Sequence, residues 1–138
     1  MTRFIRSIAM SFVVAVFTFT GAALAQSFTG NWPATVTHSQ RSNGTDCISL
    51  TDNGSFGAPH SGPASMISNG NPVSGSFTVV NGIMTISFSY PSGEGDCCDY
   101  QVFTARASKG QIGTGVYNSF GITDIGVLVF GKKDSCTP

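Results

Sequence analysis

The chain has 138 residues, of which 10% are charged, with seven basic and seven acidic side chains. That length is enough for one domain with a single hydrophobic core. Average globular proteins carry about 25% charged residues, so this surface must be built largely from Ser, Thr, Asn, Gln and Gly. The only basic cluster of the mature part is Lys132-Lys133, which argues against a nucleic-acid partner.

Residues 1–25 have the three parts of a secretory signal peptide. Arg3 and Arg6 form a basic start, residues 8–19 are mostly apolar and uncharged, and Ala23-Leu24-Ala25 offers small residues at a cleavage site. An uncleaved membrane anchor is the alternative, but a spanning helix needs about 20 strongly apolar residues. We therefore expect a secreted or periplasmic domain at residues 26–138, without membrane attachment. Removal of Arg3 and Arg6 leaves five basic against seven acidic residues, a net charge of −2.

The mature part consists of short β-rich segments separated by turn signals. Before the middle of the chain, strands are predicted at 30–38, 47–51 and 64–68, with a Gly- and Pro-rich loop at 56–62. In the first strand Trp32, Ala34 and Val36 share one face, and in the second Ile48 and Leu50 do so. Alternation of this kind predicts strands with one buried face.

Residues 73–90 predict a β-hairpin around Asn81-Gly82. Both turn residues tolerate the positive φ of a type I′ turn, and a two-residue loop determines the register of the flanking strands. In that register Gly75 lies under the ring of Phe88, and Ser and Thr occupy most of the opposite face. The apolar face carries Val73, Phe77, Val79, Met84, Ile86, Phe88 and Tyr90.

Three further strands are predicted at 100–108, 111–118 and 122–130. The last is apolar on both faces, which is typical of a central strand or of the closing strand of a barrel. Helical periodicity is absent from the mature part. About eight short strands predict an all-β fold, namely a single antiparallel up-and-down barrel, with a β-sandwich as the alternative.

Four cysteines lie in the mature part, at Cys47, Cys97, Cys98 and Cys136. An even number in an exported chain predicts two disulfides, with three possible connectivities. Because adjacent cysteines rarely bond to each other, we expect Cys47 and Cys136 each to bond to one member of the Cys97-Cys98 pair. A vicinal redox pair and a soft-metal site are the alternatives, but no Cys-x-x-Cys or Cys/His spacing supports them.

Catalytic motifs are missing from the sequence. There is no Gly-x-Ser-x-Gly elbow, His-Glu-x-x-His, P-loop or dinucleotide fingerprint. The two histidines, His38 and His60, are interpreted as ordinary surface residues. The acidic residues at 94, 96 and 99 are interpreted as a solvated turn, because their spacing does not match an EF-hand loop. We expect a non-enzymatic protein without metal or cofactor.

The Gly30-Asn31-Trp32 start of an almost purely β chain resembles the calycin barrels, the group of lipocalins, avidins and related small barrels. Trp32 followed by Cys47-Ile48-Ser49-Leu50 is similar to the start of bacterial secreted metalloprotease inhibitors. The resemblance covers about residues 28–51. It implies a barrel in which Trp32 closes one end, with Lys132 or Lys133 over the indole as a basic partner.

These observations favour a binding module, acting as a monomer on a small apolar ligand or a surface protein partner. A ligand inside the barrel would contact the apolar hairpin face, at Phe77, Met84, Ile86, Phe88 and Tyr90; in a closed small barrel these side chains instead fill the interior. The first alternative is an extracellular protease inhibitor whose residues 26–29 enter the cleft of the enzyme. The second is a structural envelope or matrix protein.

Overall fold

The computed structural model of the chain describes residues 26–54, 58–68, 70–90, 100–121 and 124–138. The predicted signal peptide at 1–25 lies outside them. None of the described residues belongs to a helix that could cross a membrane. The described part forms the strands β1 (Gly30–His38), β2 (Gly44–Leu50), β3 (Ser61–Ser68), β4 (Asn71–Val80), β5 (Ile83–Ser89), β6 (Tyr100–Ser108), β7 (Gln111–Phe120) and β8 (Asp124–Phe130).

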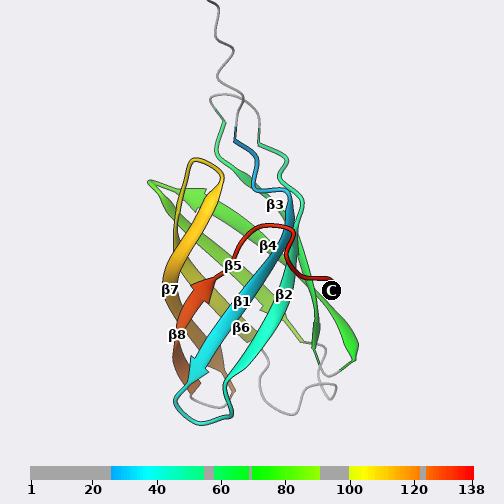
Figure 1. The fold of residues 1–138 in the computed structure, drawn as a ribbon, viewed down its shortest axis with the longest axis vertical. Coiled ribbons are helices and arrows are strands. Elements are labelled where there is room, and N and C mark those ends of the chain that lie inside the picture. Colours follow the sequence, from blue (N-terminus) through cyan, green and yellow to red (C-terminus); the bar gives the residue numbers. More distant parts are fainter. Residues whose placement is uncertain (1–25, 55–57, 69, 91–99, 122–123) are drawn as a thin grey trace, which may run out of the picture.

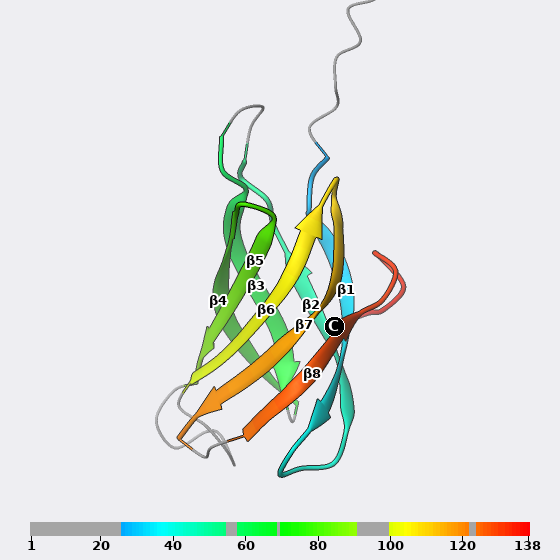
Figure 2. The ribbon, with the colours of Figure 1, turned by 90° about the vertical axis from the view of Figure 1, so that its left-hand side faces the viewer.

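The strands form a closed, antiparallel up-and-down barrel (Figures 1 and 2). Each strand pairs with the next one along the chain. The first and last strands close the barrel by pairing with each other, with Ala34 opposite Phe130 and His38 opposite Gly126. Closure leaves the sheet without the outer edge strands that a sandwich would keep. The predicted barrel is confirmed, and the β-sandwich alternative is wrong.

The central hairpin has the predicted turn and register. Asn81 and Gly82 both have positive φ angles, 51° and 76°, as a type I′ turn requires. The pairing continues without a slip to Gly75, which lies opposite Phe88. A Cβ atom at Gly75 would stand 2.7 Å from Cδ1 of the Phe88 ring. The absence of a side chain at Gly75 is therefore what lets the aromatic ring lie across the strand.

Apolar side chains that point inward fill the middle of the barrel. A side chain that lined a water-sized cavity would keep accessible surface toward it, and several of the largest ones keep none. The buried apolar set includes Trp32, Ile48, Met84, Ile86, Phe88 and Leu128 at 0% exposure and Val36, Phe77 and Phe103 at 1%. The barrel interior around these residues is packed.

The last strand is apolar on both faces for two different reasons. Leu128 and Phe130 point into the core, at 0% and 7% exposure. Ile125, Val127 and Val129 alternate with them and remain about half exposed on the outside. The strand is the closing strand of the barrel, which was one of the two alternatives that its sequence left open.

β3 begins earlier than predicted, because Ser61 and Gly62 belong to the strand and not to the preceding loop. They pair with Thr78 and Phe77 of β4. A Cβ atom at Gly62 would collide with the carbonyl oxygen of Thr51 on the neighbouring chain segment. The glycine that indicated a loop in the sequence is needed for a close approach between strands.

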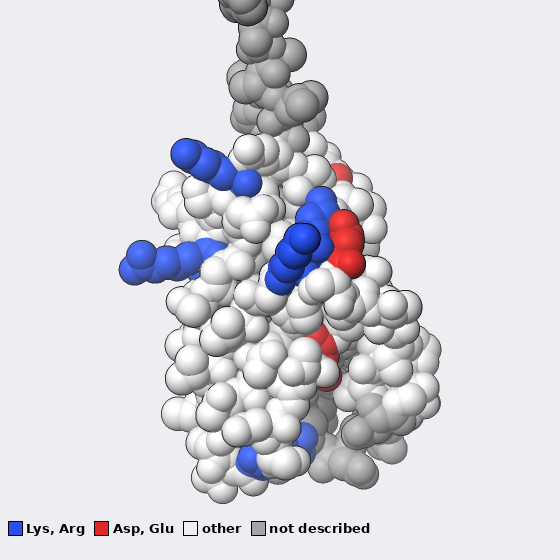
Figure 3. Space-filling model, viewed as in Figure 1, with Lys and Arg blue, Asp and Glu red and all other residues white. Residues whose placement is uncertain are grey.

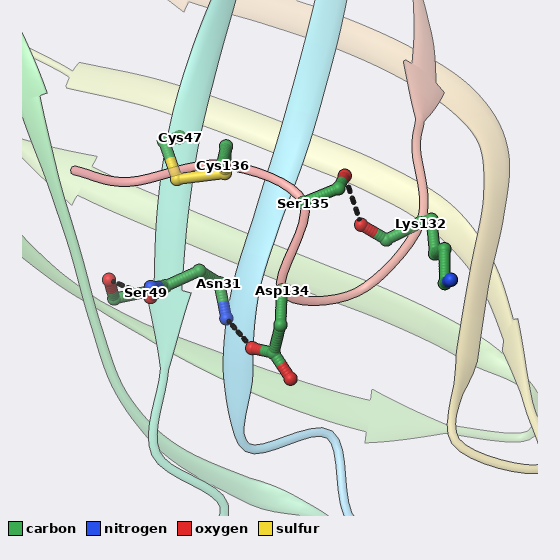
Figure 4. Close-up of a disulfide and its surroundings, with 7 residues drawn as sticks. All are labelled: Asn31, Cys47, Ser49, Lys132, Asp134, Ser135 and Cys136. Carbon is green, nitrogen blue, oxygen red and sulfur yellow. Dashed lines mark hydrogen bonds between the residues drawn. A yellow bond between two sulfur atoms is a disulfide. The ribbon is translucent and has the colours of Figure 1, made fainter.

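The disulfide prediction is wrong for Cys47 and Cys136, which bond to each other (Figure 4). Their Cα atoms are 5.8 Å apart, although 89 positions separate them in the chain. After β8 the C-terminal segment turns back across β1, where Asp134 accepts a hydrogen bond from the Asn31 N–H over 2.9 Å. That path brings Cys136 to β2. Cys97 and Cys98 lie outside the described residues.

Candidate functional site

The two ends of the barrel differ in chemistry. Residues near Trp32 close the end where β1 begins, which we call the capped end. At the opposite end, where β1 finishes at the bottom of Figure 1, the inward positions carry polar and ionisable side chains. We call this the polar end, and it comprises His38, Asp46, Ser68, Tyr90, Gln101, Tyr117, Ser119 and Asp124.

At the capped end, Trp32 is fully buried and its Nε1–H donates to the Phe28 carbonyl oxygen over 2.9 Å. Phe28 is itself 2% exposed, and its backbone N–H donates to Asp52 Oδ2 over 3.0 Å. The same oxygen lies 2.7 Å from His60 Nδ1, and the His60 ring meets the Phe28 ring edge-on at 5.1 Å. These contacts hold the segment before β1 across the barrel end.

Lys133 lies beside the start of β1. Its side-chain carbons lie against Gly30, two residues before Trp32. None of the described residues makes a cation–π contact with the indole ring. A lysine therefore lies close to the start of β1, as expected, but it makes no cation–π contact with the ring of Trp32.

At the polar end, Asp124 is fully buried and satisfied by hydrogen bonds. Its Oδ2 lies 2.7 Å from His38 Nδ1, and its Oδ1 accepts bonds of 3.0–3.1 Å from the Ser39 N–H, the Ser39 hydroxyl and the Gln40 N–H. Burial alone would raise the pKa of this carboxyl, but the hydrogen bonds from His38, Ser39 and Gln40 outweigh it and lower the pKa. Asp124 therefore ties the end of β1 to the start of β8.

An aromatic series connects this polar end to the core. The His38 ring meets Tyr117 edge-on at 5.0 Å, Tyr117 meets Phe103 at 5.3 Å, and Phe103 meets Phe88 edge-on at 5.8 Å. Edge-to-face pairs of this kind stabilise a fixed arrangement by about 0.5–1.5 kcal/mol each. The side chains at the polar end are consequently supported by rigid core residues.

Two tyrosines bring their hydroxyl groups into this end. The Tyr90 hydroxyl donates to Gln101 Oε1 over 3.0 Å. Burial raises the pKa of Tyr90, against a hydrogen bond with Ser68. Burial also raises the pKa of Tyr117, against a hydrogen bond with Ser119. Tyr90 is partly buried and Tyr117 is 2% exposed, so Tyr90 is the more accessible of the two tyrosines.

Asp46 differs from the other described carboxylates. It points inward from β2 on the same face as Ile48 and is half-buried. Unlike Asp124, its carboxylate makes no hydrogen bond with any residue that the structure describes. Burial raises the pKa of Asp46, and the nearby His38 counteracts part of that rise. Its charge also contributes to the raised pKa of both Tyr90 and Tyr117.

The residues predicted to face a ligand lie deeper. Phe77, Met84, Ile86 and Phe88 expose 0–1% of their surface, so a ligand would have to displace them. Tyr90 is the member of that set that belongs to the polar end. The residues 94, 96 and 99 lie outside the described residues, and the described part holds no group of three His, Cys, Asp or Glu side chains suited to a metal ion.

Sequence reasoning missed His38, Asp46, Tyr117 and Asp124. The signal that was available is parity, because side chains two apart on a strand share a face. His38 lies two residues after the buried Val36, and Asp46 lies two residues before the buried Ile48. An ionisable residue at the inward position of a strand end is therefore a candidate for a barrel-end site.

Charged side chains are sparse on the surface, as the composition predicts, and Figure 3 shows a few of them, some side by side, on a mostly uncharged face. Comparison of the chain with protein-family models, with curated proteins and with solved structures finds no match.

Proposed function

We propose that this protein is a secreted or periplasmic, non-enzymatic binding module that holds a small ligand at the polar end of its barrel. The fold supplies a rigid wall of packed apolar side chains, and the polar end supplies a few convergent polar groups. Small-molecule sites commonly combine these two features. The resemblance to calycin barrels, which include many ligand carriers, agrees with this proposal.

The observation that carries the proposal is the half-buried Asp46 carboxylate at the polar end, which has no hydrogen-bond partner among the described residues. Its charge contributes to the raised pKa of Tyr90 and Tyr117 at the same end. Charged groups at inward positions are costly unless something pairs with them. Asp52 and Asp124 are paired within the protein. A ligand that pairs with Asp46 would offset the cost at this position.

The compartment is inferred from the sequence and the disulfide together. The Cys47–Cys136 bond is compatible with an oxidising compartment. The signal peptide predicted at residues 1–25 would deliver the chain there.

One of the alternatives is a protease inhibitor whose residues 26–29 enter the cleft of the enzyme. That role would need a free segment, whereas Phe28 within it is buried. The binding module is therefore preferred to the inhibitor.

Nuclear magnetic resonance with a panel of small fragments tests the proposal. Isotope-labelled protein, exported and purified from culture, is titrated with amines, carboxylic acids, alcohols and sugars. We expect at least one class to shift the signals of Tyr90, Tyr117 and Asp46, and Tyr90→Phe to weaken its binding several-fold. Tyr100→Phe is the matched control, because Tyr100 lies on the outer face of β6. Shifts confined to the outer face, or none, would contradict the proposal.

A further inference from the structure

The segment before β1 lies against the turn between β6 and β7. Gln26, the first residue of the described part, is exposed. A Cβ atom at Gly110, in that turn, would stand 3.0 Å from the Gln26 Cβ. Two residues further on, Phe28 is buried and its N–H donates to Asp52 Oδ2. Contacts with the barrel are therefore in place from Gln26 onward.

The predicted signal-peptidase site ends at Ala25, directly before this contact. Cleavage there makes Gln26 the first residue of the exported chain and gives it a free α-amino group. All eight strands and the contacts of Phe28 belong to the part that remains. The secretion that forms part of the proposed function thus leaves a glutamine at the N-terminus of a folded domain.

An N-terminal glutamine carries a nucleophile and an electrophile on the same residue. Its amine nitrogen can reach its own side-chain carbonyl carbon, Cδ, and close a five-membered lactam ring. At neutral pH a fraction of the α-amino groups is unprotonated and therefore nucleophilic. The leaving group is ammonia, so the step needs no other reactant.

The surroundings of Gln26 leave this chemistry free to occur. Its side-chain amide makes no hydrogen bond with any residue that the structure describes. The adjacent Ser27 hydroxyl is occupied with Thr29, because it accepts the Thr29 N–H and donates to the Thr29 hydroxyl, both over 3.1 Å. The buried Phe28 anchors the chain two residues away. The exposed side chain of Gln26 can therefore turn back onto its own amine.

We propose that Gln26 of the exported protein is a modification site, at which the N-terminal glutamine becomes pyroglutamate beside the β6–β7 turn. This inference rests on the signal cleavage within the proposed function. The amine lone pair attacks Cδ and forms the new C–N bond. The Cδ–Nε2 bond breaks, and Nε2 takes a proton from the amine and leaves as ammonia. The product has lost one positive charge and offers no free amine to aminopeptidases.

Tandem mass spectrometry of the N-terminal peptide tests the modification. The full chain is exported from a bacterial host, incubated at neutral pH and quenched in acid before digestion. We expect the peptide to begin at residue 26 and to be lighter by one ammonia than the peptide with free glutamine. A synthetic peptide of residues 26–30, digested and analysed in parallel, measures any lactam formed during handling.

Gln26→Asn is the matched control. Asparagine keeps the side-chain amide but is one methylene shorter, so its lactam would need a strained four-membered ring. We expect the variant to keep a free amine and to lose its first residue to an aminopeptidase, whereas the wild type resists the enzyme. Because Gln26 is exposed, thermal unfolding of the variant should match that of the wild type.

Nuclear magnetic resonance tests the place of the modified residue. We expect nuclear Overhauser effects between the side-chain protons of residue 26 and the α-protons of Gly110, because the two residues lie against each other. Their absence would overturn the placement of the lactam beside the turn.

The outcomes separate this inference from the binding function. A free Gln26 amine after incubation, no more lactam than in the handled peptide, or a mature chain that begins at another residue would each overturn the modification and leave ligand binding at the polar end standing. Retention of residues 1–25 would overturn both the modification and the exported location. A lactam in a protein whose polar end binds no fragment would support the modification and remove the ligand-binding function.

Discussion

His38 Nδ1 lies 2.7 Å from Asp124 Oδ2, across the pair of strands that closes the barrel. The two residues are 86 positions apart in the chain and belong to β1 and β8. Asp124 also accepts hydrogen bonds from Ser39 and Gln40, so one buried carboxylate holds the end of the first strand, the following turn and the last strand together. Asp124 therefore links the two strands that close the barrel at its polar end.

Asp124→Asn is expected to lower the free energy of unfolding by about 3 kcal/mol, because an amide cannot accept all of the bonds that the buried carboxylate accepts. Urea unfolding followed by circular dichroism measures the change. The control is Asp134→Asn, which keeps an oxygen acceptor at an exposed position and should change stability by about 0.5 kcal/mol or less. Equal effects of the two substitutions would contradict the assigned role of Asp124.

Stability should depend on pH through Asp52 and Asp124. Burial raises the pKa of each carboxyl, but hydrogen bonds lower it by more, from Phe28, Gly54 and His60 for Asp52 and from His38, Ser39 and Gln40 for Asp124. A folded-state pKa below the unfolded value stabilises the protein above the unfolded pKa, about 3.9 for Asp. That contribution is lost as the pH falls from about 4 through the folded pKa values.

The pH prediction is checked by urea unfolding at a series of pH values. The wild-type free energy of unfolding should decrease steeply below about pH 4. Asp124→Asn, with one of the two carboxyls removed, should show a shallower decrease. An identical slope in both proteins would show that Asp124 does not contribute to the acid sensitivity.

Phe28→Ala should open the capped end and expose the single tryptophan, Trp32. Trp32 is fully buried beside Phe28, so wild-type fluorescence emission should be blue-shifted and poorly quenched by acrylamide. We expect the variant to show red-shifted emission, stronger quenching and a loss of about 3 kcal/mol in the free energy of unfolding. Phe120→Ala, at a phenylalanine that is 51% exposed, should leave the emission unchanged.

Gly75→Ala should destabilise the central hairpin, because the new methyl group would meet the Ser87 carbonyl oxygen and the Phe88 ring. Overpacking of this kind costs about 1–3 kcal/mol. Gly44→Ala is the matched control, since a Cβ atom there has no neighbour within 4 Å. Thermal unfolding of the two variants measures the difference, and equal melting temperatures would contradict the close packing of Phe88 on Gly75.

The disulfide between Cys47 and Cys136 should be found by mass spectrometry of peptides from a non-reducing digest. A peptide that links Cys47 to Cys97 or Cys98 would contradict the structure. The double variant Cys47→Ser/Cys136→Ser should lose about 2–4 kcal/mol of stability, because the bond restricts a long loop of the unfolded chain. Urea unfolding of this variant against wild type gives the value.

The features that the sequence could predict are those decided between neighbours in the chain. A two-residue Asn-Gly turn determines which residues face each other, and alternation then assigns each side chain to a face. The eight strands, the packing of Phe88 over Gly75 and the burial of Trp32 follow from such local rules. Strand ends were less predictable, because Ser61 and Gly62 pair only with the neighbouring strand that the fold supplies.

The sequence by itself determined a β-rich domain with alternating faces, a hairpin register and a low-charge surface. The tertiary structure decided what distant residues do together. The pairing of β1 with β8 joins His38 to Asp124, and the path of the C-terminal segment joins Cys136 to Cys47. The physical reason is that barrel closure and the course of the C-terminal segment depend on the whole sheet, whereas turn geometry and alternation depend on a few adjacent residues.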